Sequence, residues 1–205
     1  MEQYNLLVAL LIAVCNYAKD LHYNVKGSAF YGKHLFADLI LDGLDEACDD
    51  IRENVLLGNG VAPLHSSLYL RAAAQMVPPI TPDDRANFFM MKALVDMVRG
   101  MVEGMEAPSR GANSLLDSIG EHMDKMAGLL FLQVKDGAIE EGKGFTKEEC
   151  KACVERAVDR AKAELAKIDY DKVAATVAGY SNQCAAMCED EEESVLDKLS
   201  KKLGV

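Results

Sequence analysis

Residues 31–57, YGKHLFADLILDGLDEACDDIRENVLL, decide the predicted fold and hold most of the candidate metal ligands. The stretch contains no proline, and its pattern predicts one long helix. At a rise of 1.5 Å per residue, His34 and Glu53 on such a helix lie roughly 28 Å apart, too far to bind the same ion. One chain therefore cannot bring all the imidazole and carboxylate groups of this stretch to one site.

Two copies of the helix remove this difficulty if they cross antiparallel. In residue number, the midpoint between His34 and Glu53 is the same as the midpoint between Asp38 and Asp49. It lies beside Gly43, whose absent side chain allows two helices to approach closely. His34 of one copy then faces Glu53 of the other, and the two aspartates face each other likewise. The dimer gains two identical clusters about 22 Å apart, and such mixed ligands suit iron, manganese or zinc. The candidate ligands are His22, His34, Asp38, Asp49 and Glu53.

The first 63 residues predict a helical hairpin. Apolar residues recur three and four apart over 3–26, which indicates an amphipathic helix that Gly27 terminates. The short link to the next helix makes the two helices antiparallel. Residues 58–63, GNGVAP, end the second helix.

A second hairpin follows a crossover that contains a short helix near 66–76. Thr81 and Pro82 begin the third helix as N-cap and first residue, with two aspartates at the positive end of the helix dipole. The third helix runs to about Met105 and the fourth over about 112–134. Two hairpins joined by one long crossover predict an all-α, ferritin-like four-helix bundle over residues 1–135.

Composition limits the classes of function. The chain has 205 residues, half of them apolar, and a formal net charge of −11. Basic residues form only short clusters flanked by acids, so DNA binding is not expected. The apolar run at 6–14 is too short to span a bilayer and no signal-peptide cleavage pattern follows it. We therefore expect a cytoplasmic protein without a membrane segment.

Residues 136–205 predict a separate helical extension. A glycine-containing linker, KDGAIEEGKG, leads into a capping box at 146–149 that begins a helix to about Lys167. A turn at 168–171 and a second helix to about Cys188 follow.

Four of the six cysteines lie in this extension. If its helices fold about Ile168, Cys150 faces Cys188 and Cys153 faces Cys184. A four-cysteine zinc site, the two disulfides Cys150–Cys188 and Cys153–Cys184, and packed reduced thiols all agree with this spacing. The remaining two, Cys15 and Cys48, are expected to pack as small buried apolar residues.

The segment LHYNVKG at 21–27, the candidate ligands at their spacings, and LLGNG followed by a proline resemble the Dps-type mini-ferritins over residues 1–135. The resemblance implies a hollow dodecamer built from two-fold dimers, with a di-iron ferroxidase site at each end of the dimer interface. His22, His34 and Asp38 would come from one subunit, and Asp49 and Glu53 from its partner. It also implies oxidation of Fe(II) by hydrogen peroxide, storage of ferric mineral and protection against oxidative stress.

Some positions depart from the family pattern. The first helix is expected to start almost at Met1, without the lysine-rich N-terminal arm of DNA-coating members, so we expect a DNA-protecting shell to be the weaker alternative, beside a metal buffer without redox turnover. Ser114 lies where the family's iron-uptake pore often has an aspartate, and the stripe Asp117, Glu121 and Asp124 either replaces it or is an exposed face. Tyr23 stands where the family usually has a tryptophan, and it either takes up oxidising equivalents or packs in the interface.

Overall fold

The computed structural model describes residues 1–27, 29–135 and 146–168, and every regular element in these ranges is a helix. The predicted all-α class is confirmed. The chain divides into two compact units, Met1–Lys167 and Ile168–Val205, and the description below concerns the first.

The first predicted helix is present, but the second one is interrupted. Helix α1 covers Glu2–Asn24, and the continuous helix expected over 31–57 is instead α2 (Phe30–Leu41), α3 (Leu44–Asp50), a π-helix η1 (Ile51–Leu56) and a short 3₁₀ turn η2 (Leu57–Asn59). The single-helix prediction for this stretch is therefore wrong.

The interruption lies at Asp42 and Gly43. Asp42 has extended backbone angles, and Gly43 has φ +72° in the left-handed region and serves as the N-cap of α3. Glycine reaches this conformation without a steric penalty and is a poor helix former, while an aspartate side chain competes with helical hydrogen bonds. The pair Asp–Gly in mid-stretch thus ends one helix and begins the next.

The second half of the unit contains α4 (Ser66–Met76), α5 (Asp84–Glu103) and α6 (Arg110–Lys135). Helix α5 begins later than predicted, because the side chain of Asp83 caps it by accepting from the amide of Arg85. The hydroxyl of Thr81 instead interacts with Asn87 inside the helix, 2.9 Å away.

Helix α7 (Lys147–Leu165) begins with the predicted capping box. The side chain of Thr146 accepts from the amide of Glu149, whose carboxylate accepts from the amide of Thr146. The predicted extension differs from the structure here, since α7 lies in the same compact unit as the preceding helices and packs on α4 and α5. The apolar face of α7 must be buried against other helices, and α4 and α5 bury it. That face consists of Cys150, Val154, Ala157, Val158, Ala161 and Leu165.

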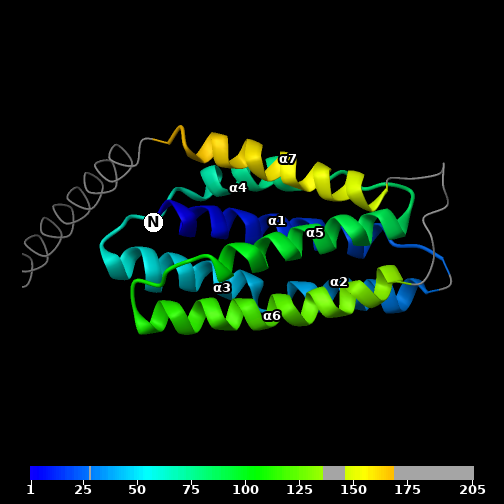
Figure 1. Cartoon of the computed structure of the whole chain (residues 1–205), viewed down its shortest axis with the longest axis horizontal. Coiled ribbons are helices and arrows are strands. Elements are labelled where there is room, and N and C mark those ends of the chain that lie inside the picture. The colour runs from blue at the N-terminus through cyan, green and yellow to red at the C-terminus, as the bar shows by residue number, and fades with distance from the viewer. Residues whose placement is uncertain (28, 136–145, 169–205) are drawn as a thin grey trace, which may run out of the picture. The chain divides into compact units, whose positions relative to one another are not determined.

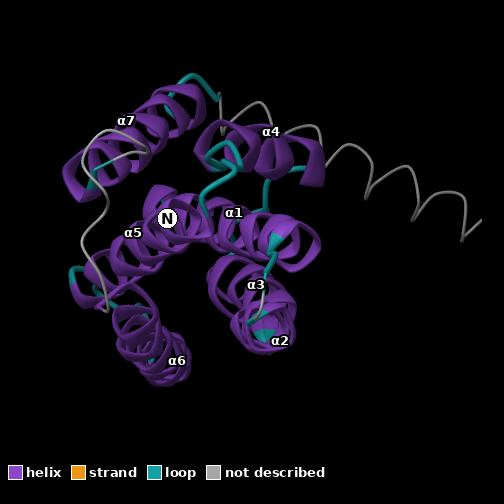
Figure 2. Ribbon diagram, turned by 90° about the vertical axis from the view of Figure 1, so that its right-hand side faces the viewer, coloured by secondary structure: helices purple, strands orange, loops and turns teal. Residues whose placement is uncertain are grey.

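The helices form three layers (Figures 1 and 2). Helices α1 and α5 lie in the middle, α4 and α7 lie on one side, and the α2–α3 segment and α6 lie on the other. Because α1 is covered from both sides, its apolar residues occur all around the helix. By length and composition α1 would also qualify as a membrane span, but most of its apolar window is buried within this unit, as in a core helix.

Candidate metal centre

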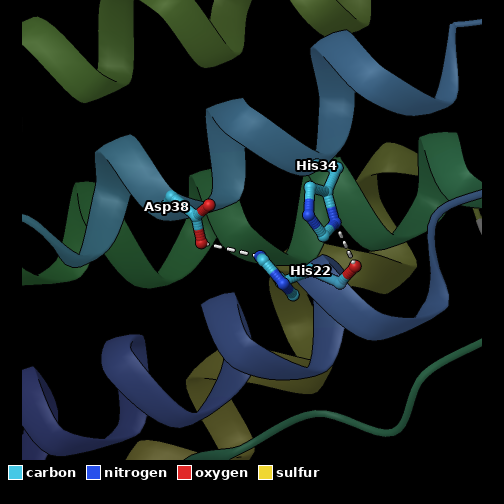
Figure 3. Close-up of side chains that lie close together, drawn as sticks. All are labelled: His22, His34 and Asp38. Atoms are coloured by element: carbon cyan, nitrogen blue, oxygen red, sulfur yellow. Dashed lines mark hydrogen bonds and ion pairs between the residues drawn. The ribbon is translucent and has the colours of Figure 1, made fainter.

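Three of the predicted ligands meet where the last turn of α1 lies against α2 (Figure 3). His22 comes from α1, whereas His34 and Asp38 lie one turn apart on α2. One possible ligand atom from each residue lies within 4.8 Å of the others. In the part of the chain that the structure describes, this is the group of histidine, cysteine and carboxylate side chains that is compact enough to hold a metal ion.

The orientation of His34 is set by the backbone of α1. Nδ1 of His34 lies 3.0 Å from the carbonyl oxygen of His22. A carbonyl oxygen can only accept, so Nδ1 carries the proton and Nε2 of the neutral ring has a free lone pair. A second hydrogen bond of this kind is what usually fixes the tautomer of a histidine that binds a metal.

His22 and Asp38 form an ion pair when the imidazole is protonated. Nδ1 of His22 lies 2.6 Å from a carboxylate oxygen of Asp38, as the dashed line in Figure 3 marks. Ligand atoms that share one ion of the size of Zn²⁺ lie about 3 Å apart, a separation similar to this one.

Solvent reaches the cluster from one side. The side chain of His22 is 21% exposed and that of Asp38 is 47% exposed. The rings of His22 and His34 lie with their centroids 3.6 Å apart, and Phe30 lies 5.2 Å from His34. The cluster thus combines an apolar wall with an open carboxylate, which leaves a path for a hydrated cation.

Tyr23 lies at the edge of the cluster. Its ring meets that of His22 edge to face at 4.9 Å, and the residue is 80% exposed. In a single chain it is therefore not a packed residue. Whether a second chain covers it, as expected for an interface tyrosine, stays a prediction.

The other two predicted ligands lie away from the cluster in the same chain. Asp49, in α3, is 71% exposed, and Glu53, in the π-helix η1, is exposed as well. π-Helical turns are rare and occur frequently at functional sites, because they change the direction in which side chains leave the helix. One chain brings three of the five candidates together and leaves Asp49 and Glu53 facing solvent.

Arg52 was not singled out from the sequence, although the i, i+3 spacing from Asp49 was a usable signal. One of its terminal nitrogens lies 3.4 Å from Asp49 and the other 3.4 Å from the hydroxyl of Ser66. The guanidinium also lies over the ring of Tyr69, 5.5 Å from its centroid. Arg52 therefore links a candidate ligand to the first turn of α4.

The acidic stripe of α6 is partly neutralised. Asp124 accepts from Nε of Arg99 at 2.6 Å, and this bond raises the pKa of the Arg99 guanidinium. Asp117 accepts from the side-chain amide of Asn113 at 2.9 Å. The role of the stripe in iron uptake stays a prediction.

The cysteines in the described residues are free thiols. Cys15 and Cys48 are buried, as predicted, and burial raises the pKa of their thiols to about 11 and about 12. Cys150 is also buried, with its sulfur 3.9 Å from the carbonyl oxygen of Ala86, and its pKa is raised to about 11.

The predicted partners of the α7 cysteines cannot be placed. Cys184 and Cys188 lie outside the described residues, and Cys153 is half-buried on α7. The zinc site and the two disulfides both stay predictions.

Comparison with known proteins adds no relative. No family profile matches the chain, and no match was found among curated proteins or among solved structures. The resemblance to Dps-type mini-ferritins therefore rests on the sequence alone, on the motif residues from Leu21 to Pro63.

Proposed function

We propose that this protein is an iron-oxidising and iron-storing mini-ferritin of the Dps type. It oxidises Fe(II) with hydrogen peroxide at sites shared by two subunits and stores ferric mineral in a hollow dodecamer in the cytoplasm. The observation that carries the proposal is the convergence of His22, His34 and Asp38, whose ligand atoms lie within 4.8 Å of one another.

The donor set suits the chemistry. Carboxylates bind both Fe(II) and Fe(III), whereas imidazole favours Fe(II) and leaves coordination positions open to an oxidant. Two Fe(II) ions each lose one electron, and one hydrogen peroxide takes up both electrons with two protons, so that its O–O bond breaks and two water molecules form. A site that binds a pair of iron ions therefore matches the oxidant better than a site for a single ion.

The arrangement of the helices supports the ferritin-like part of the proposal. Helices α1 and α5 contact each other in the middle layer, and each has a neighbour, α2 and α6 respectively, in the outer layer. The crossover between the two hairpins carries the short helix α4. This order of elements agrees with two antiparallel hairpins joined by one long connection.

The exposed Asp49 and Glu53 complete the site in this proposal. They belong to a second subunit, which is packed antiparallel beside Gly43. Each subunit then gives three ligands to one cluster and two to the other.

The test mixes purified protein with Fe(II) and a substoichiometric amount of hydrogen peroxide and follows the absorbance of ferric species. We expect fast formation in the wild type and only the rate without protein in a His34→Ala, Asp38→Ala variant. Equal rates in the two proteins would reject the ferroxidase.

A metal buffer without redox turnover is the second candidate, favoured by the same donor set because zinc and manganese accept it. Metal analysis of protein from cells grown with ample iron separates the two. Ferric iron in large excess over subunits indicates storage, whereas about one or two zinc or manganese ions per subunit indicate a buffer.

A further inference from the structure

Two free thiols lie one helical turn apart near the start of α7. Cys150 is 1% exposed and packs against α5, with its sulfur 3.9 Å from the carbonyl oxygen of Ala86. Cys153 is only half-buried, so solvent reaches it more easily than it reaches Cys150. The pair therefore combines an accessible thiol with a protected one, and neither belongs to the metal cluster of α1 and α2.

The helix holds these two residues at a separation that a disulfide can close. Residues three apart on an α-helix have Cα atoms about 5 Å apart, within the range of about 4.4–6.8 Å that disulfides allow. Their Cβ atoms lie about 5–6 Å apart, whereas a disulfide brings them to about 3.8 Å. Closure therefore requires a local tightening of this turn of α7.

A buried hydroxyl near the two thiols has no hydrogen-bond partner among the described residues. It belongs to Tyr17 of α1, a helix that α7 contacts, and Tyr17 is 0% exposed. Burial, followed by the charges that Cys150, Asp20 and Cys153 can carry, raises the pKa of the Tyr17 phenol above its ordinary value. The phenol thus stays a donor, and a buried donor without a partner is costly. Such a group can stabilise negative charge that develops on a nearby sulfur or oxygen atom.

We propose that Cys150, Cys153 and Tyr17 form a peroxide-reactive site, a dithiol that hydrogen peroxide oxidises to a disulfide within α7. The site is separate from the metal cluster, and the inference does not rest on the proposed function.

The reaction has two steps. The thiolate of Cys153 attacks one oxygen of hydrogen peroxide, so that an S–O bond forms, the O–O bond breaks, and the leaving hydroxide takes up the proton that Cys153 lost. Cys150 then attacks the sulfur of the Cys153 sulfenic acid. The S–S bond forms, the S–O bond breaks, and the hydroxyl leaves with the Cys150 proton as a second water molecule. Two thiols together lose two electrons, and one peroxide is reduced to two water molecules.

Burial assigns the roles of the two thiols. Cys153 is the accessible residue and therefore reacts first with the oxidant. Burial, together with the neighbouring Cys153, raises the pKa of Cys150 to about 11, so Cys150 stays protonated at neutral pH and reacts in the second step. The hydroxyl of Tyr17 is the donor for the charge that develops between them.

The experiment treats the reduced full chain with a few equivalents of hydrogen peroxide in EDTA and then labels the remaining thiols with N-ethylmaleimide under denaturing conditions. Mass spectrometry should count six labels before oxidation, one for each cysteine, and four after it. Trypsin cleaves after Lys151, so the disulfide should join the peptides 148–151 and 152–156 until dithiothreitol separates them. The buried Cys15 and Cys48 should stay labelled and serve as internal controls.

Serine variants test the role of each thiol. Cys150→Ser should leave Cys153 as a sulfenic acid that dimedone traps, whereas Cys153→Ser should keep Cys150 reduced. Cys184→Ser, Cys188→Ser should form the same link as the wild type. All three variants should oxidise Fe(II) at the wild-type rate, because they leave the metal cluster intact, so the failure of this inference and the failure of the ferroxidase are distinguishable. Circular dichroism checks that the helices are retained.

Tyr17→Phe tests the buried hydroxyl. The variant keeps the ring and removes a donor without a partner, so it should not lower the free energy of unfolding. We expect the disulfide to form about 10-fold more slowly, as for the loss of one hydrogen bond in the transition state. The matched control Tyr4→Phe removes a hydroxyl of the same helix that donates to the carbonyl oxygen of Glu106, and it should leave the rate unchanged. Equal rates in Tyr17→Phe and the wild type would exclude Tyr17 from the site.

Three results would overturn the dithiol. The first is six labels after treatment with peroxide. The second is zinc bound in a stoichiometric amount to the purified chain and protecting these thiols. The third is a pair of links Cys150–Cys188 and Cys153–Cys184, the pairing that the sequence suggests, because the α7 thiols would then react with another segment and not with each other. Loss of the 148–151 to 152–156 link in Cys184→Ser, Cys188→Ser would have the same meaning.

Discussion

His34 donates from Nδ1 to the main-chain carbonyl oxygen of His22, 3.0 Å away, so one candidate ligand is oriented by the backbone of another. This bond ties the first turns of α2 to the end of α1 and leaves Nε2 of His34 unprotonated in the neutral ring. The geometry of the cluster therefore depends on the α1–α2 hairpin and not on side-chain contacts alone.

Replacing His34 should reduce Fe(II) oxidation strongly. His34→Ala removes a ligand and its anchoring bond, and we expect the initial rate with hydrogen peroxide to fall by at least about 100-fold, the upper range for changes around metal sites. The control is His65→Asn. His65 is the N-cap of α4 and asparagine is a good capping residue, so this variant should oxidise Fe(II) at the wild-type rate. A rate equal to that of the wild type in His34→Ala would contradict the assignment.

Gly43→Ala should destabilise the protein. Gly43 has φ +72°, where a side chain costs about 1–2 kcal/mol. Gly32→Ala is the matched control, since Gly32 lies within α2 at an ordinary backbone conformation and an added Cβ atom meets nothing within 4 Å. That substitution should leave the free energy of unfolding unchanged or raise it by about 0.5–1 kcal/mol. Urea denaturation measures the free energy of unfolding of both variants. If Gly43→Ala and Gly32→Ala change it equally, a side chain at position 43 causes no backbone strain and the prediction is wrong.

Tyr69→Phe should lower the free energy of unfolding, because it removes the hydroxyl that makes buried hydrogen bonds between α1 and α4. The hydroxyl of Tyr69 donates to the side-chain oxygen of Asn5 and accepts from the amide of Leu64. Its loss leaves buried polar groups without these partners, at a cost of about 1–3 kcal/mol in urea denaturation. Tyr31→Phe, at an exposed position, should change stability by less than about 0.5 kcal/mol.

The buried thiols should make the protein less stable at high pH. Burial raises the pKa of Cys48 to about 12, above the value in the unfolded chain. The unfolded state therefore loses its proton first, and stability that is complete below about pH 9 is lost as the pH rises toward about 12. Cys48→Ala should reduce this loss by about 4 kcal/mol, the free energy that a three-unit shift in pKa represents. Denaturation curves recorded across this interval give the two pH profiles, and parallel profiles would contradict the burial argument.

The protein should not retard duplex DNA in a gel at low salt. The net charge is −11, so phosphates are repelled unless basic residues gather on one surface. A shift that disappears with added salt would contradict this prediction and would indicate that basic residues gather on one surface of the protein.

The local patterns of the sequence determined much of this structure. Apolar periodicity placed α1, and the Thr146–Glu149 capping box placed the start of α7, because both depend on residues within one or two helical turns. The meeting of His22 with His34 was also predictable, since a short link between antiparallel helices brings the end of one beside the start of the next.

Other features were decided only by the tertiary structure. The pair Asp42–Gly43 permits a break without requiring one, so a stretch that reads as one helix is divided into α2 and α3 in the structure. The packing of α7 on α4 and α5 joins segments far apart in the chain, and the contact of Arg52 with Ser66 joins the second helical segment to α4. Such contacts depend on which apolar faces meet across the layers, and periodicity shows that a face is apolar without showing what covers it.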